Sequence, residues 1–96
     1  MDAKELVDKL EAKFEEFKIS SGEGRKEIYK SLSTLCGIVA SQYYNGYLSE
    51  KCAGFLDSCK EMSKIRHSLE YDETRYISFA ISDLRIIKRL LSNKSS

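Results

Sequence analysis

The sequence contains no proline, a single histidine and no long apolar run. Because proline is the residue that most strongly interrupts helices, its absence favours long, continuous ones. With His67 as the only histidine, any histidine-dependent triad or metal cluster would depend on one residue. The longest weakly polar run, residues 32–40, is far shorter than the ~20 residues that span a bilayer. We therefore expect no metal site, no cofactor and no membrane association.

The chain also lacks a net charge of either sign, since 16 bases and 15 acids leave only +1. Overall charge thus gives no reason to expect nucleic acid or a membrane as the partner. The distribution is less even: residues 1–24 hold seven acids and four bases, whereas residues 73–96 hold two acids and five bases. We favour attraction between neighbouring helices as the explanation, and the alternative is a basic docking surface near the C-terminus.

The three cysteines, Cys36, Cys52 and Cys59, show no tight metal-binding spacing. Cys52 and Cys59 are seven residues apart on a predicted helix, hence about 10 Å along its axis, which is too far for a disulfide. We expect reduced thiols that serve as small core residues. The N-terminus alternates charged with apolar residues and shows no secretory signal, so we predict a cytoplasmic protein.

The 96 residues, 42% hydrophobic and 32% charged, are enough for one compact domain. Apolar residues recur every three or four positions in four segments, which predicts an all-α protein, an antiparallel (up-down-up-down) four-helix bundle. We expect helices at about 2–18, 25–44, 49–67 and 73–91 in a single domain, residues 1–91, with 92–96 as a frayed tail. Asp2, Ser49 and Asp72 are the expected N-caps, and Asn45-Gly46 is the expected end of the second helix.

The fourth predicted helix carries two apolar seams side by side. Together with Ile81 they cover roughly 220° of the helix, more than an outer helix of a small bundle usually buries. The surplus predicts either a central position or contact with a second molecule. One seam consists of Ile77, Ala80, Leu84, Ile87 and Leu91; the other, the candidate partner-binding seam, consists of Tyr76, Phe79, Asp83, Ile86 and Leu90.

Asp83 interrupts the candidate partner-binding seam at its middle. It lies either at a rim where its carboxylate reaches water, or within a helix–helix interface where it meets a basic residue of the partner. We favour the second interpretation slightly, because apolar residues flank Asp83 along the seam on both sides. Polar residues in such interfaces can fix register and partner choice.

A second candidate surface is the row of small residues Ser33, Gly37 and Ser41 on the second predicted helix. Small residues four apart allow another helix to approach closely, although they also occur on faces that contact water. Before this helix, Gly22 and Gly24 precede Arg25 and Lys26, an arrangement that loosely suggests an anion cradle. A flexible connector is the commoner explanation, and Walker A spacing is absent.

Arg75, Arg85 and Arg89 fall on one polar side of the fourth predicted helix, with serines between them. Arginines in this arrangement can contact the phosphates of a nucleic acid. Arg85 and Arg89 also suit a helix C-terminus electrostatically, which requires no function. Base-stacking platforms and known DNA-binding motifs are absent from the sequence.

No grouping of residues predicts catalysis, since the carboxylates alternate with lysines along charged helix faces. We therefore predict a non-catalytic protein-binding module, either an accessory subunit of a larger complex or a small inhibitor or regulator. Its partner would be another protein chain, with a homodimer as the simplest case. The alternative is a nucleic-acid-binding module, or an accessory subunit of a nucleic-acid-handling complex, that uses the arginines of the fourth helix.

Overall fold

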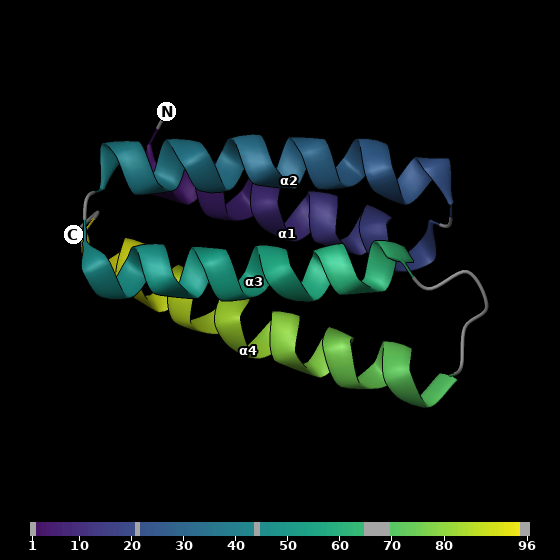
Figure 1. The fold of residues 1–96 in the computed structure, drawn as a ribbon. Helices are drawn as coiled ribbons and strands as arrows, with labels where there is room; N and C mark the ends of the chain where they lie inside the picture. Colours follow the sequence, from purple (N-terminus) through teal and green to yellow (C-terminus); the bar gives the residue numbers. More distant parts are fainter. Residues whose placement is uncertain (1, 21, 44, 65–69, 95–96) are drawn as a thin grey trace.

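The computed structural model of the chain consists of α-helices that pack side by side as a bundle (Figure 1). The structure describes residues 2–20, 22–43, 45–64 and 70–94. Within these ranges there are four helices and no strand, which confirms the prediction of an all-α, four-helix protein. The helices are α1 (Ala3–Ile19), α2 (Glu23–Gln42), α3 (Gly46–Lys64) and α4 (Glu70–Lys94).

Each helix contacts two neighbours. The pairs with close backbone contact are α1 with α2, α2 with α3, α3 with α4, and α1 with α4. In the described part of the chain the diagonal pairs, α1 with α3 and α2 with α4, have no such backbone contact. The four helices therefore surround one shared core, in a molecule of 42 × 21 × 17 Å.

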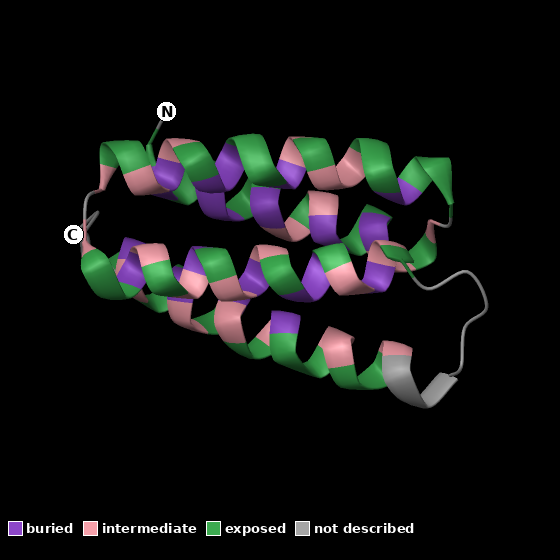
Figure 2. Cartoon of the chain, viewed as in Figure 1, coloured by how far each residue is buried: buried purple, intermediate pink, exposed green. Residues whose placement is uncertain are grey.

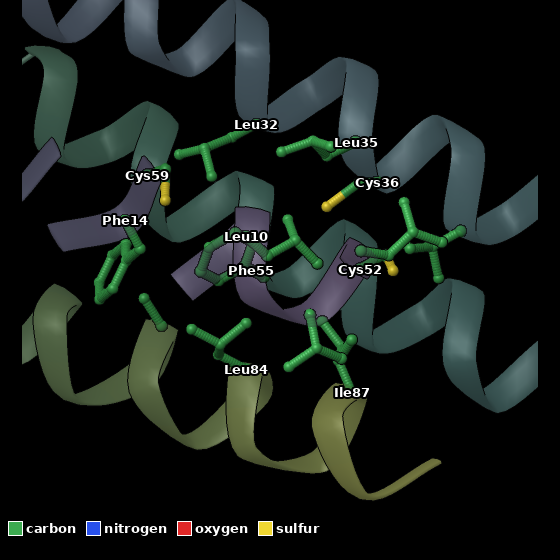
Figure 3. Packing of buried hydrophobic residues seen from close by; sticks show 14 of the residues in the cluster. Leu10, Phe14, Leu32, Leu35, Cys36, Cys52, Phe55, Cys59, Leu84 and Ile87 are labelled. Carbon is green, nitrogen blue, oxygen red and sulfur yellow. The ribbon is translucent and has the colours of Figure 1, made fainter. Parts of the chain in front are cut away.

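The core is formed by the inward faces of all four helices, which Figure 2 shows as buried stripes along the ribbons. Phe14 of α1 and Phe55 of α3 meet at its centre, with ring centroids 5.4 Å apart (Figure 3). From the first seam of α4, Ala80, Leu84, Ile87 and Leu91 are buried, while Ile77 is partly buried against the core. This seam was correctly predicted from the spacing of its residues.

Capping residues fix where α1 and α3 begin. The Asp2 carboxylate accepts a hydrogen bond of 2.8 Å from the Glu5 backbone N–H, so Asp2 is an N-cap, as predicted. The expectation for α3 was wrong. Asn45 accepts a hydrogen bond of 3.0 Å from the Leu48 N–H and caps α3, which therefore begins at Gly46 and not after Ser49. Asparagine can serve at either helix end, and here its side chain bonds forward along the chain.

The connection between α1 and α2 is shorter than the sequence suggested. Gly22 has φ 57°, a conformation that favours glycine, and α2 begins directly after it at Glu23. Helix α4 also extends beyond its predicted bounds, from Glu70 to Lys94, so the proposed tail is helical at least to residue 94. His67 and the predicted end of α3 at residues 65–67 lie outside the described residues, as does the side chain of Asp72.

Candidate functional site

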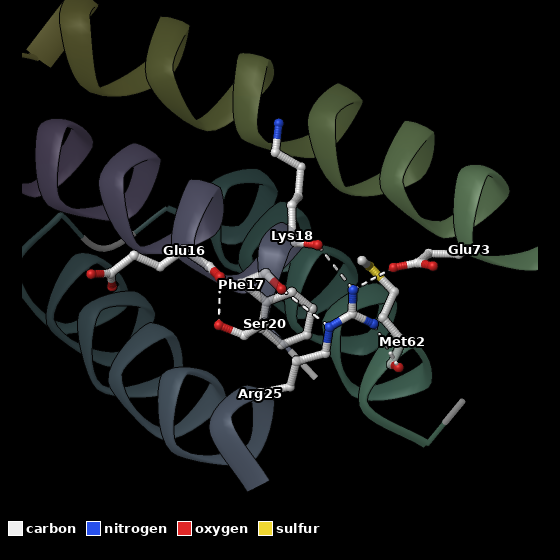
Figure 4. A network of polar contacts seen from close by, with 7 residues as sticks. All are labelled: Glu16, Phe17, Lys18, Ser20, Arg25, Met62 and Glu73. Carbon is white, nitrogen blue, oxygen red and sulfur yellow. Dashed lines mark hydrogen bonds and ion pairs between the residues drawn. The ribbon is translucent and has the colours of Figure 1, made fainter. Parts of the chain in front are cut away.

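Arg25, which the sequence placed in a possible anion cradle, is buried at one end of the bundle (Figure 4). Its side chain reaches from the first turn of α2 toward the ends of α1 and α3. Its guanidinium donates hydrogen bonds to the backbone carbonyls of Phe17 (3.1 Å), Lys18 (3.2 Å) and Met62 (3.3 Å), and it pairs with the Glu73 carboxylate. These partners come from α1, α3 and α4.

The fork of the guanidinium fits this environment because it offers several donors in one plane. The carbonyls of Phe17, Lys18 and Met62 lie in the last turns of α1 and α3, where a positive charge complements the helix dipole. The guanidinium also lies 5.1 Å from the centre of the Phe17 ring. Because its donors are used within the chain, Arg25 serves as a structural clamp and does not present a cradle for an external anion.

The candidate partner-binding seam of α4 is divided between the core and the surface. Tyr76, Asp83, Ile86 and Leu90 are partly buried, whereas Phe79 keeps 48% of its surface exposed. The Tyr76 ring meets the Phe79 ring edge-on with centroids 6.4 Å apart, and the Arg75 guanidinium lies 5.6 Å from the Phe79 ring centre. We call Arg75, Tyr76 and Phe79 the Phe79 patch.

Asp83 lies at a helix–helix contact, but within the chain. Its carboxylate is 3.9 Å from the Lys51 ammonium of α3, and both side chains are partly buried. It also lies over Gly54, where an added Cβ would come within 2.8 Å of the carboxylate. Burial raises the pKa of Asp83, and Lys51 offsets this effect only in part. The basic partner of Asp83 in this structure is therefore intramolecular.

The small residues Ser33, Gly37 and Ser41 form an exposed row on the outer side of α2. A Cβ built on Gly37 would meet no atom within 4 Å. Among the residues that the structure describes, no other helix makes the close approach to Gly37 that these small residues permit. The row remains open to a partner, but nothing on the surface around it indicates one.

The arginines of the alternative nucleic-acid surface, Arg75, Arg85 and Arg89, are all exposed. Their surroundings are mixed in charge. Arg85 lines a hollow between α1 and α4 together with Glu11 and Glu15, and Lys88 forms an ion pair of 3.3 Å with Glu11. The Lys88–Glu11 pair joins the basic C-terminal helix to the acidic N-terminal helix. Attraction between neighbouring helices is the explanation that we favoured for the uneven charge distribution.

An open groove of about 560 Å³ lies between α1 and α2. Lysine and glutamate side chains form its sides, and the pairs Lys13–Glu16 (3.1 Å) and Lys30–Glu27 (3.3 Å) join charges along each helix. Exposed pairs of this kind contribute little to stability. The groove presents no concentration of one charge that would select a ligand.

The three cysteines are buried free thiols, as expected for core residues. The nearby Cys52 thiol, together with burial, raises the pKa of the Cys36 thiol, and Cys36 lowers the pKa of Cys52. Burial raises the pKa of Cys59 to about 12. Spacing along the sequence pointed only to Cys52 with Cys59, and gave no sign that Cys36 and Cys52 affect each other's pKa.

The described residues contain no group of three or more His, Cys, Asp or Glu side chains placed to hold a metal ion. Among the helices that the structure describes, none combines the length and hydrophobicity needed to cross a bilayer.

Comparison of the chain with protein-family models, with curated proteins and with solved structures found no match in any of the three.

Proposed function

We propose that the protein is a non-catalytic protein-binding module that uses the Phe79 patch, with a second copy of the chain as the simplest partner. The fold in this proposal is the antiparallel, up-down-up-down bundle predicted from the sequence. The short connections around Gly22 and Asn45 support that order, because each leaves the next helix beside the one before it.

The exposure of Phe79 is the observation that carries the proposal. Among the side chains whose burial the structure describes, three large apolar or aromatic ones are strongly exposed: Ile19 (88%), Tyr47 (51%) and Phe79 (48%). Of these, Phe79 has a second aromatic ring and an arginine against it in the middle of a long helix. Aromatic residues and arginine are the types most enriched among residues that dominate binding energy at protein interfaces.

The role of α4 in the bundle also favours this face. Its first seam fills the core against α1 and α3, so the helix is held in place without Phe79. A partner that covered Phe79 and the exposed parts of Tyr76 and Ile86 would extend burial along the same helix. For a domain of this size, such burial would add materially to stability.

The test is the effect of Phe79→Asp on self-association, measured by gel filtration with light scattering at micromolar concentration. We expect wild-type protein to form dimers and the variant to be monomeric, with helical content by circular dichroism near that of the wild type. Tyr47→Asp is the matched control, because Tyr47 is about equally exposed but lies on α3. It should leave the dimer intact.

Three outcomes would contradict this proposal. A wild-type protein that is strictly monomeric would remove the second copy as partner. Equal loss of the dimer in the Tyr47 control would show that the effect is not specific to the Phe79 patch. Unfolding of Phe79→Asp would show that Phe79 belongs to the protomer's own core.

Nucleic-acid binding through Arg75, Arg85 and Arg89 has weaker support. Arg75 packs on Phe79, and Glu11 and Glu15 place negative charge beside Arg85. If nucleic acid is nevertheless the partner, binding should fall steeply with added salt, because phosphate contacts release counterions. The absence of a gel shift at low salt with single- and double-stranded DNA and RNA would end this alternative.

A further inference from the structure

Helices α3 and α4 lie side by side and form one outer face of the bundle (Figure 1). The α4 side of this face is a row of residues that recur every three or four positions, within about 80° of the helix circumference. Most of these side chains are exposed, and Ile86 is partly buried. We call them the basic row: Arg75, Phe79, Ser82, Ile86 and Arg89.

The acids of α4 whose side chains the structure describes do not neutralise the basic row. Glu73 pairs with the buried Arg25, and Asp83 faces Lys51 of α3. Both carboxylates are thus engaged within the chain. The outer side of α4 therefore keeps a net positive charge around the exposed Phe79 ring.

The α3 side of the same face is acidic. Three acids lie seven and four positions apart, hence within about 40° of one another, and we call them the acidic stripe: Glu50, Asp57 and Glu61. Glu61 pairs with Lys64 at 3.3 Å, an exposed pair that contributes little. Gly54, three residues before Asp57, contacts Asp83 of α4, so the acidic stripe borders the α3–α4 contact.

A contact at one end of the bundle fixes the relative heights of the two charged groups. Arg25 bonds both to the Met62 carbonyl of α3 and to the Glu73 carboxylate of α4, which places these two turns level with each other. Arg75 follows Glu73 by two residues, and Glu61 directly precedes Met62. Arg75 is therefore level with the turn of α3 that carries Glu61.

A two-fold dimer through this face can be arranged in two ways. If the axis runs across the helices, the basic row meets the partner's basic row and the acidic stripe meets the partner's acidic stripe. If the axis runs along the helices, each basic row meets the partner's acidic stripe, and every residue keeps its height. Because like charges at an interface are unfavourable, charge complementarity selects the second arrangement.

We propose that a second copy of the chain covers the Phe79 patch with the acidic stripe of its α3, so that Arg75 of each protomer pairs with the partner's Glu61. This proposal rests on the proposed function, because it names the surface that meets the Phe79 patch. With the axis along the helices, the two Phe79 rings lie at the same height on either side of it. Aromatic residues at the centre of an interface and charged residues at its rim are the usual arrangement.

Charge reversal tests the pairing, with dimer dissociation constants measured by sedimentation equilibrium. Arg75→Glu and Glu61→Arg should each raise the dissociation constant at least about 10-fold, because each dimer then contains two contacts between like charges. An equimolar mixture of the two variants should form dimers within about 3-fold of the wild-type dissociation constant, because both contacts again join opposite charges. Pairing within one chain cannot produce this rescue, since each variant chain alone keeps like charges at positions 61 and 75.

Glu16→Arg is the matched control. Glu16 is an exposed acid with a lysine three residues away, like Glu61, but it lies on α1. Its reversal changes the charge equally and should leave the dissociation constant unchanged. Tyr47, the control residue of the preceding experiment, lies 14 positions before Glu61, about 20 Å along α3, and so outside the Arg75–Glu61 contact.

A mixture of Arg75→Glu and Glu61→Arg that stays monomeric would overturn the proposal, as would equal weakening by Glu16→Arg. A dimer that Phe79→Asp abolishes but Glu61→Arg leaves intact would remove this inference alone. A strictly monomeric wild type would remove the second copy from both proposals. Circular dichroism checks the folding of each variant. If Glu61→Arg does not fold, the milder Glu61→Ala should weaken the dimer about 3-fold, and an unchanged dissociation constant would contradict the pairing.

Discussion

Two arginines of this protein lie against phenylalanine rings, and they differ in almost every other respect. The Arg25 guanidinium is 5.1 Å from the Phe17 ring centre and that of Arg75 is 5.6 Å from the Phe79 ring centre. Arg25 is 7% exposed and bonds to three backbone carbonyls and Glu73, whereas Arg75 is exposed at the surface of α4. The same pair of residue types thus occurs once inside the bundle and once outside it.

The difference shows that burial determines what such a pair does. Inside the bundle, each donor of Arg25 must meet an acceptor, because an unpaired buried charge is very costly. No buried side-chain nitrogen or oxygen among the described residues lacks a hydrogen-bond partner. At the surface, water satisfies Arg75, so its side chain and the Phe79 ring stay available to a second molecule.

The largest expected effect comes from Arg25→Ala. The substitution removes the arginine donor from the Glu73 carboxylate and from the carbonyls of Lys18 and Met62, while the Phe17 carbonyl keeps the Ser20 backbone N–H as a donor. We expect the free energy of unfolding to fall by about 3 kcal/mol, measured by urea denaturation. Arg25→Lys is the control and should recover only part of the loss, because one ammonium cannot replace the fork. A loss below about 1 kcal/mol in Arg25→Ala would contradict the clamp.

Two helical glycines extend the contrast between enclosed and open positions. Gly37 has open space around it, so Gly37→Ala should stabilise the protein by about 0.5–1 kcal/mol through better helix propensity. In Gly54→Ala the new methyl group would meet the Asp83 carboxylate at 2.8 Å, and the resulting displacement should cancel most of this gain. Paired urea denaturation curves test the difference. Equal stabilisation by both substitutions would show that the approach of Asp83 to Gly54 does not matter.

Asp83 should give a smaller effect that depends on pH. Its folded pKa is raised above the ordinary 3.8, so its contribution to stability is present below that pH and is lost as the pH rises through the raised value. Asp83→Asn removes this titration. Relative to wild type, the variant should gain stability between about pH 3 and about pH 7, by less than about 1 kcal/mol. A relative loss over this range, measured by urea denaturation, would show that the Lys51 ion pair outweighs burial.

Arg75→Ala should give the smallest effect on folding and thereby complete the comparison with Arg25. Because Arg75 is exposed, we expect the free energy of unfolding to change by no more than about 0.5 kcal/mol. The same variant should weaken self-association, since Arg75 belongs to the Phe79 patch. A stability loss as large as that of Arg25→Ala would remove the distinction between the two arginines.

Periodicity was sufficient to predict the four helices and the core seam of α4, because an apolar stripe follows from helical geometry. It could not divide the second seam into buried and exposed parts. That division depends on α3, whose Lys51 and Gly54 receive Asp83, and on α1, which α4 also contacts. Part of the apolar surplus on α4 is therefore covered by its own neighbours, and Phe79 is the clearest remainder.

The role of Arg25 could not be predicted for a related reason. Its two most distant partners, Met62 and Glu73, are 37 and 48 residues away in the sequence. A single chain gives no signal that links residues so far apart. Sequence reasoning could therefore offer only a flexible connector or, less commonly, an anion cradle for Arg25, and only the packing shows that the acceptors of this arginine are internal.

The separation between Arg25 and its acceptors has a consequence for how the chain acquires its structure during synthesis. When only α1 and α2 have been made, Met62 and Glu73 do not yet exist, and water must hydrate much of the guanidinium. In an isolated α1–α2 hairpin, the end of the interface that contains Arg25 would have to stay open to water. Because Arg25 destabilises such partial structures, we expect the cooperative unit of folding to extend at least from α1 to the first turns of α4.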